Sequence, residues 1–330
     1  MATVVLVGTL DTKGLEYDYL RERLRGHGVD TLLVDAGVLS EPRAKPDVSR
    51  EEVARAAGAD VHALAEADDR GAAVETMARG AAAIVTTLHS EGRLDGVLAL
   101  GGSGGTAVAT EAMRALPVGI PKLMVSTMAS GDTRPYVGAS DVTMTYSVVD
   151  ISGINAVSAR ILANAAAAMA GMARAEPPAA AGEGPLVGAT MFGVTTPCVT
   201  TARERLEELG YEVLVFHATG TGGQSMEALM RSGFITASLD ITTTELADDL
   251  VGGVLSAGPD RLKAAGELGI PQVVSLGALD MVNFGPIDTV PPEFRSRNLY
   301  KHNPTVTLMR TTAAECAELG RRIALKLNAA

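Results

Sequence analysis

The feature that most constrains the fold is a repeat, because several short blocks of the first half return in the same order in the second half. The matching pairs are Arg21-Glu22-Arg23-Leu24 with Arg203-Glu204-Arg205-Leu206, Gly119-Ile120-Pro121 with Gly269-Ile270-Pro271, and Val142-Thr143 with Val306-Thr307. One such match arises easily by chance, whereas several in a fixed order indicate an internal duplication. The chain is therefore predicted to hold two related domains.

Each copy has the pattern of a strand, an amphipathic helix, a glycine break and a second strand. Strands that alternate with helices form parallel sheets with helices on both faces. With 330 residues, the chain is long enough for two such domains. We predict an α/β fold of two tandem Rossmann-like domains with parallel sheets, related by internal duplication, with a cleft between them. A linker rich in Pro, Gly and Ala, residues 175–185, separates an N-terminal α/β domain, residues 1–174, from a C-terminal α/β domain, residues 186–330.

Composition excludes several classes of protein. The net charge of −11 argues against a nucleic-acid surface, which needs clustered Lys and Arg. Two cysteines, Cys198 and Cys316, do not indicate a disulfide framework. The N-terminus has no basic region typical of a signal peptide, and the longest apolar stretch, 163–173, is too short to span a bilayer. These observations predict a cytoplasmic protein that does not enter a membrane.

A glycine-rich loop, Gly101 to Thr106, follows the apolar run 97–100 and precedes a predicted helix over 107–115. A strand that passes through such a turn into a helix leaves backbone N–H groups free to hold a phosphate. The loop fits G-x-G-x-x-A but follows a later strand than the dinucleotide fingerprint does, which argues against a nicotinamide dehydrogenase. A tight packing turn is the alternative interpretation.

Other polar residues follow predicted strands of the first half. Lys13 and the threonines beside it favour phosphate contact, and Asp35 favours hydrogen bonds from ribose hydroxyls. Helix capping, a plain turn or an ordinary polar loop are the alternatives. The first half also has an insert, 40–70, that the second half lacks. The candidate nucleotide-binding residues are Thr9, Asp11, Thr12, Lys13, Asp35, Gly101, Gly102, Ser103, Gly104, Gly105, Thr106, Ser126, Met128, Gly131, Asp132, Thr133, Arg134, Thr221, Gly222 and Gly223.

The second half offers a different chemistry at the corresponding positions. Thr221, Gly222 and Gly223 follow a strand and form a second candidate anion site. The glycine loop of the first half corresponds to a segment of hydroxyls and acids, which favours substrate or metal contact, with helix capping as the alternative. The candidate catalytic residues are Asp240, Glu245, Asp280 and His217. No spacing of Cys and His resembles a zinc site, whereas Mg²⁺ on carboxylates stays open.

Long motifs along most of the chain resemble one known family. They are Val7-Gly8-Thr9-Leu10-Asp11-Thr12-Lys13, Leu100-Gly101-Gly102-Ser103-Gly104-Gly105-Thr106, 121–132, Thr195-Thr196-Pro197, 217–223 and Asp280-Met281-Val282-Asn283-Phe284-Gly285. The family is that of the ATP-binding N-terminal domain of plant tobamovirus resistance proteins and their bacterial relatives. The resemblance implies a two-part α/β protein that binds ATP near the Gly101 loop and forms homodimers. Members usually continue beyond the last helix, where this sequence stops at Ala330.

Together these observations give a leading hypothesis and two alternatives. The leading hypothesis is an ATP- or nucleotide-binding protein whose phosphates are held by residues 101–106 in an interdomain cleft. An ATP-dependent enzyme that acts on a small acidic metabolite is the first alternative. A regulatory module that senses nucleotides and binds a protein partner is the second.

Overall fold

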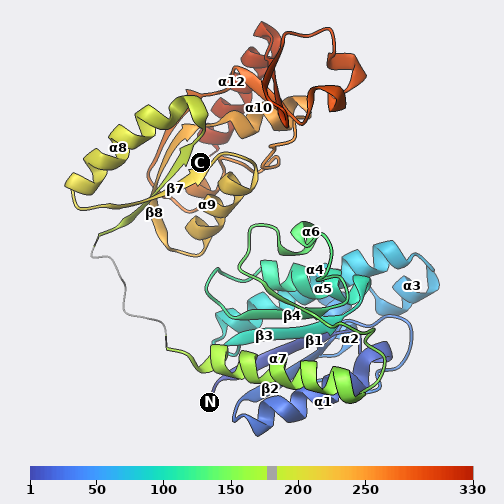
Figure 1. The fold of residues 1–330 in the computed structure, drawn as a ribbon. Helices are drawn as coiled ribbons and strands as arrows, with labels where there is room; N and C mark the ends of the chain where they lie inside the picture. Colours follow the sequence, from blue (N-terminus) through green and yellow to red (C-terminus); the bar gives the residue numbers. More distant parts are fainter. Residues whose placement is uncertain (177–183, 330) are drawn as a thin grey trace. The chain divides into compact units, whose positions relative to one another are not determined.

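The computed structural model describes residues 1–176 and 184–329, which form two compact units, Met1–Pro177 and Pro178–Ala330 (Figure 1). Most of the predicted linker, residues 175–185, lies outside the described residues. Each unit is an α/β structure built on a parallel sheet, as the alternating pattern predicts. The units are described separately below.

Unit 1 is built on a five-stranded sheet, sheet A, in the order β2-β1-β3-β4-β5. All neighbouring strands in it run parallel. The strands are β1 (Thr3–Gly8), β2 (Asp30–Asp35), β3 (Gly96–Gly101), β4 (Lys122–Ser126) and β5 (Thr143–Tyr146). Because the chain reverses its direction of winding between β1 and β3, the carboxyl ends of these two strands are where an open α/β sheet binds ligands.

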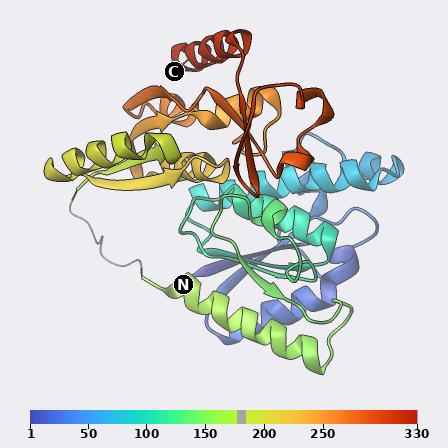
Figure 2. The same ribbon diagram turned by 45° about the horizontal axis from the view of Figure 1, so that its top comes forward.

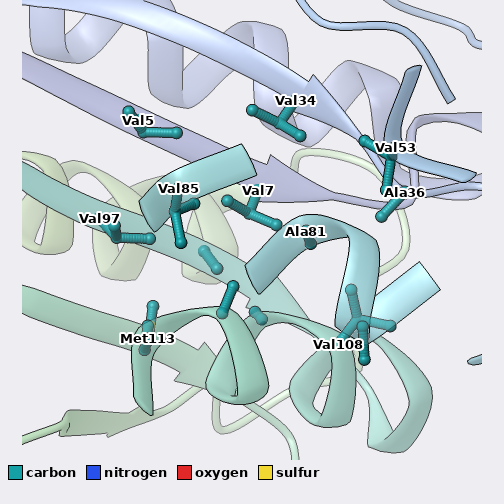
Figure 3. Packing of buried hydrophobic residues seen from close by; sticks show 14 of the residues in the cluster. Val5, Val7, Val34, Ala36, Val53, Ala81, Val85, Val97, Val108 and Met113 are labelled. Carbon is teal, nitrogen blue, oxygen red and sulfur yellow. The ribbon is translucent and has the colours of Figure 1, made fainter. Parts of the chain in front are cut away.

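Helices cover both faces of sheet A (Figures 1 and 2). Helices α1 (Leu10–Gly26) and α7 (Ala156–Arg174) pack on one face, and α2 (Arg50–Ala56), α4 (Arg70–Ser90) and α5 (Ser103–Arg114) pack on the other. Figure 3 shows the second layer, in which Val7 and Val97 of the sheet meet Val85 of α4 and Val108 of α5. The short helices α3 (Val61–Glu66) and α6 (Arg134–Val137) complete unit 1.

Helix α7 is longer than the predicted apolar stretch, and its length and composition alone would allow it to cross a membrane. It is the one helix of that kind within residues 1–176 and 184–329. Its Leu162, Ala166 and Met169 are buried in the same core as α1, against sheet A. One face of α7 therefore packs in the core of unit 1.

Unit 2 contains a four-stranded parallel sheet, sheet B, in the order β7-β6-β8-β9. This is the order of β2-β1-β3-β4 in unit 1, as the repeat predicts, although common descent of the units stays a prediction. The strands are β6 (Leu186–Met191), β7 (Glu212–His217), β8 (Ile235–Thr242) and β9 (Gln272–Gly277). The helices beside them are α8 (Thr196–Glu208), α9 (Thr221–Arg231), α10 (Thr244–Val251) and α11 (Ala264–Glu267).

The repeat is wrong about the last part of unit 2. Val306-Thr307 was predicted to match the parallel strand β5, but it lies in an antiparallel sheet, sheet C, with the order β10-β12-β11. Val282 and Met309 of this sheet bury their side chains against α10 and α12, so this segment forms a core of its own beside sheet B. The elements are β10 (Met281–Phe284), β11 (Leu299–Asn303), β12 (Val306–Arg310), α12 (Ala313–Asn328) and the short 3-10 helices Gly193–Thr195, Ile287–Thr289 and Pro292–Phe294.

Two helices begin one turn earlier than the sequence indicates. Helix α5 starts at Ser103 rather than Ala107, and α9 starts at Thr221, where the sequence pattern predicts a helix only from Ser225. In both cases glycines that look like a loop form the first helical turn. The difference matters because it places the glycine N–H groups at helix ends, where they have no acceptor within the helix.

Candidate ligand site in unit 1

A cavity of about 520 Å³ opens at the carboxyl end of sheet A. Its wall is formed by the turn after β1, the segment after β2, the start of α4 and the glycine loop after β3. The predicted site residues that line it are Thr9, Asp11, Thr12, Lys13, Gly101, Gly102, Ser103, Gly104 and Gly105. The structure thus brings together two motifs that lie about ninety residues apart in the chain, because β1 and β3 are neighbours in the sheet.

The N-terminus of α5 opens into this cavity without a cap. Gly102 is the capping position, and no side chain accepts a hydrogen bond from the first turn. The N–H groups of Ser103, Gly104 and Gly105 have no acceptor among the described residues. A Cβ atom on Gly101 would lie 2.9 Å from the Cα of Gly105, so the turn is too tight for a side chain there. Free N–H groups and the helix dipole together favour an anion at this position.

Arg70 supplies a positive charge to the cavity, and it is not among the residues predicted from the sequence. It is the first residue of α4 and lines the cavity beside the glycine loop. A Cβ atom built on Gly104 would lie 3.7 Å from one of its terminal guanidinium nitrogens. Within the part of the chain that the structure describes, Arg70 makes no hydrogen bond or ion pair. The sequence feature that could have pointed to Arg70 is its position at the end of the insert, residues 40–70, which the second half lacks.

The turn after β1 also lines the cavity. The hydroxyls of Thr9 and Thr12 are 3.0 Å apart, and Lys13 interrupts the helical geometry of α1 with φ −123° and ψ 17°. The ammonium group of Lys13 donates a hydrogen bond to the Ile151 carbonyl while the side chain lines the cavity. Asp11 is buried, and its Oδ2 accepts a hydrogen bond from the Leu39 N–H at 2.9 Å.

Asp35 does not line the cavity, although it ends β2 as predicted. Its carboxylate is fully buried and accepts hydrogen bonds from the N–H groups of Leu10, at 3.1 Å, and Gly37, at 2.9 Å. Burial raises the pKa of Asp35 against the effect of these two donors. Its observed role is to cap α1, the structural alternative to a contact with ribose.

The predicted residues of the segment after β4 lie outside the cavity wall. Ser126 is buried, and its hydroxyl is 2.6 Å from that of Thr106. Arg134 is exposed, and Asp132 occupies its guanidinium group with hydrogen bonds of 2.9 and 2.7 Å. The predicted nucleotide contacts that the structure places away from the cavity are Thr106, Ser126, Met128, Gly131, Asp132, Thr133 and Arg134.

In unit 2, the second candidate anion site is already filled by the chain itself. The N–H groups of Gly220 and Gly223, at the start of α9, donate hydrogen bonds to Oε1 of Glu245 at 2.7 and 3.0 Å. A Cβ atom on Gly223 would lie 2.2 Å from Oε2 of Glu245. An internal carboxylate thus stands at the start of α9, where Thr221, Gly222 and Gly223 were predicted to hold a ligand phosphate, and their contact with a ligand stays a prediction.

The two central candidates for catalysis, Asp240 and Glu245, are also engaged within the fold. Both are fully buried, and Arg261 donates to Oδ2 of Asp240 at 3.0 Å and to Oε2 of Glu245 at 2.7 Å. Glu227 joins the same cluster at 3.2 Å from Arg261. Although burial lowers the pKa of Arg261, the adjacent carboxylates raise it above its ordinary value, so the guanidinium stays charged. This network replaces the predicted substrate contact with a structural role.

The remaining candidates of unit 2 lie apart from this cluster. Asp280 pairs with Arg310 at 2.9 Å near the surface. The ring of His217 is exposed and meets the ring of Phe192 edge-on, with centroids 5.3 Å apart. Across residues 1–176 and 184–329, no three His, Cys, Asp or Glu side chains gather in a way that could hold a metal ion.

Asp248 is a further buried acid on α10. It accepts hydrogen bonds from the N–H groups of Leu255, at 2.7 Å, and Asn283, at 2.8 Å, and it is fully buried. Burial raises its pKa to about 6 from an ordinary value of 3.8, against the effect of these donors. Asp248 therefore holds its proton in the folded chain at a pH where the unfolded chain has lost it.

We expect unit 2 to lose stability as the pH rises from about 4 to about 6. The folded pKa lies above the unfolded one, so the contribution is present below pH 4 and is lost as the pH passes through 6. A shift of this size corresponds to roughly 3 kcal/mol of unfolding free energy. Carboxyl ¹³C NMR of the native protein should show Asp248 titrating near pH 6, and a midpoint at or below pH 4 would contradict this prediction.

The comparisons with known proteins agree with the two-unit division. Residues 2–178 match the model described as the N-terminal domain of the uncharacterised protein family UPF0261, and residues 184–330 match its C-terminal domain. A UPF0261 protein of Clostridium tetani is 58% identical over 327 residues, which cover 99% of this chain and 81% of that protein. A UPF0261 protein of Rhizobium meliloti is 48% identical over the same shares of the two chains.

A plant protein is also similar. The ToMV resistance protein Tm-1(GCR237) of Solanum lycopersicum is 52% identical over 269 residues, which cover 80% of this chain but only 36% of the tomato protein. Among solved structures, a substrate-binding protein of Clostridium difficile covers 83% of this chain and 74% of its own, with 13% identity and a TM-score of 0.23, too low to support an argument about the fold. The family models match both units, and the bacterial relative of Clostridium tetani is covered over 81% of its length, so the chain belongs to the UPF0261 family.

Proposed function

We propose that unit 1 binds a phosphorylated ligand of the ATP class, with its phosphates at the N-terminus of α5. One observation carries the proposal: the first turn of α5 has N–H groups that open into a large cavity beside the guanidinium of Arg70, and neither has a partner within residues 1–176 and 184–329. At the start of α1, Asp35 accepts a hydrogen bond from the Leu10 N–H, and at the start of α9, Glu245 accepts hydrogen bonds from two glycine N–H groups. The start of α5 therefore offers a ligand anion both N–H donors and a guanidinium cation.

The rest of the cavity suits an uncharged, largely apolar part of the same ligand. Leu64, Val74 and Met77 line it from α3 and α4, and Val38 lines it from the segment after β2. A volume of about 520 Å³ lies within the range of small-molecule sites. A nucleotide has this division into a charged phosphate chain and a flat base, which favours it over a small inorganic anion.

The insert of the first half has a clear part in this proposal. Residues 40–70 contain α2 and α3 and end at the first residue of α4, and they supply Leu64 and Arg70 to the cavity wall. The ligand site thus depends on the segment that distinguishes unit 1 from unit 2. We further propose a cytoplasmic protein, since Cys198 and Cys316 are both free and exposed, as is usual in a reducing compartment.

The proposal is tested by comparing two arginines. Calorimetric titration of ATP should show binding to the wild-type protein, and Arg70→Ala should weaken it by about tenfold, the usual effect of losing one charge-assisted hydrogen bond. Arg134→Ala is the matched control, because Arg134 is paired with Asp132 outside the cavity, and it should change the affinity by less than about twofold. Absence of ATP binding, or equal losses in the two variants, would count against the proposal.

A further inference from the structure

The strands on either side of the cavity separate before they end. β1 and β3 pair only from Val4 opposite Gly96 to Leu6 opposite Leu98, although the strands continue to Gly8 and Gly101. Their outer ladders run to the ends, from β1 to β2 at Gly8 and from β3 to β4 at Gly101. The opening is therefore local to the β1–β3 gap, and the segments that follow the two strands, from Thr9 and from Gly102, line the ligand cavity.

The hydroxyl of Tyr17 fills this gap. Tyr17 lies on α1, is fully buried, and accepts a hydrogen bond from the Leu100 N–H at 3.0 Å. Its hydroxyl oxygen is 2.5 Å from the Val7 carbonyl and 2.9 Å from the Leu100 carbonyl. If the β1–β3 pairing continued in the same register, the Leu100 N–H would donate a hydrogen bond to the Val7 carbonyl. The Tyr17 hydroxyl instead lies between these two groups. Burial raises the pKa of Tyr17, which keeps the hydroxyl protonated and able to donate.

Gly8 makes room for the ring that carries this hydroxyl. A Cβ atom on Gly8 would lie 2.0 Å from Cζ of Tyr17, so no other residue fits at the end of β1 with the ring in place. The glycine in the Val7-Gly8-Thr9 motif is therefore explained by the space that the ring of Tyr17 needs, and not by contact with a ligand. In unit 2, the corresponding gap is bridged from strand to strand, because Thr242 N–H donates to the Thr190 hydroxyl at 3.1 Å.

We propose that Tyr17 is a positioning residue whose inserted hydroxyl holds β1 and β3 apart and thereby sets the width of the ligand cavity. This inference rests on the proposed function for the identity of the ligand. The turn with Thr9 and Thr12 follows β1, and the glycine loop follows β3, so the spacing of the two strands sets the spacing of the two binding segments. Without the hydroxyl, the Leu100 N–H and the Val7 carbonyl satisfy each other, and the two segments move together.

The test compares Tyr17→Phe with Tyr19→Phe. Both remove one hydroxyl from α1, but Tyr19 donates to the Ala159 carbonyl at 3.0 Å, on α7 and away from the cavity. Calorimetric titrations with ATP and with pyrophosphate should show that Tyr17→Phe binds each at least about tenfold more weakly, whereas Tyr19→Phe stays within about twofold of wild type. A folded Tyr17→Phe protein that is less stable yet binds like wild type would overturn the inference.

A crystal structure of Tyr17→Phe separates this inference from the proposed function. The expected result is a direct hydrogen bond from Leu100 N–H to the Val7 carbonyl, with β1–β3 pairing extended by two residues. If wild type binds neither probe, the proposed function fails, and this structure still decides the role of Tyr17. Unchanged strand spacing in the variant would show that the hydroxyl does not hold the strands apart.

Discussion

Arg261→Met should destabilise unit 2 by roughly 3–5 kcal/mol, the usual cost of removing one partner from a buried ion network. Arg261 is almost fully buried and neutralises Asp240 and Glu245 together. Methionine fills similar space but leaves these carboxylates without a counter-charge. Burial already raises the pKa of Glu245 against the effect of Arg261, so the loss of the arginine makes its charged form still less favourable.

Hydrogen-exchange mass spectrometry in increasing denaturant measures this effect for each unit separately. Peptides from α9, β8 and α10 should lose protection at lower denaturant in Arg261→Met, while peptides from unit 1 should not change. Arg205→Met, which removes an exposed pair with Glu208, is the control and should cost less than about 1 kcal/mol. Adding Asp240→Asn to Arg261→Met should recover part of the loss, because one uncompensated charge is removed. Equal stability of Arg261→Met and wild type would show that the network is not required.

The two α/β units with parallel sheets were largely predictable from the sequence. Parallel strands alternating with helices follow from the repeated blocks, and sheets A and B have matching orders. Sheet C was not predictable, because Val306-Thr307 has the same local pattern as a parallel strand. What decides its pairing is the burial of Met309 and Val282 against α12 and α10, which is a tertiary effect that a repeat of a few residues does not contain.

The residues of the candidate site likewise fall into those with a local sequence signal and those that only the fold brings together. The motifs after β1 and β3 were identified because glycines, threonines and a lysine at strand ends have a local physical meaning. Arg70 and Arg261 were missed because each lies near its site only in the fold: Arg70 lies beside Gly104, and Arg261 pairs with Asp240. Asp240 and Glu245 look like catalytic acids when their partner is unknown. A sequence shows the acids, whereas only the fold shows that a buried arginine neutralises them.

The N-termini of α5 and α9 differ in whether the chain itself supplies a negatively charged group to them. In unit 2, the glycines at the start of α9 surround Glu245, which belongs to the chain. In unit 1, the glycines at the start of α5 face a cavity with no side chain in the place of that carboxylate. The same physical preference of a helix N-terminus for negative charge is met internally in one unit and left open in the other. This contrast suggests a direct way to close the open site.

Gly104→Asp should abolish ATP binding while the protein stays folded. The backbone at Gly104 has no positive φ, and a Cβ atom there would make only ordinary contacts, at 3.7 Å from Arg70 and 3.9 Å from Val74. An aspartate in the first turn of α5 interacts favourably with the helix dipole and pairs with Arg70. It would then occupy the site as Glu245 does in unit 2. Repulsion of about 4 kcal/mol between charges about 4 Å apart predicts a loss of affinity greater than a hundredfold at low salt.

Gly104→Asn separates the charge from the size of the new side chain. Asparagine has almost the same shape without the negative charge, so its affinity for ATP should fall by no more than about tenfold, which is one free-energy step of 1.4 kcal/mol. The difference between the two variants should shrink as salt is added, because screening weakens the repulsion. Equal losses in both variants would mean that the side chain only blocks the cavity, and unchanged binding in Gly104→Asp would place the phosphates elsewhere. A large difference that depends on salt would instead identify the start of α5 as the place where the ligand's negative charge is held.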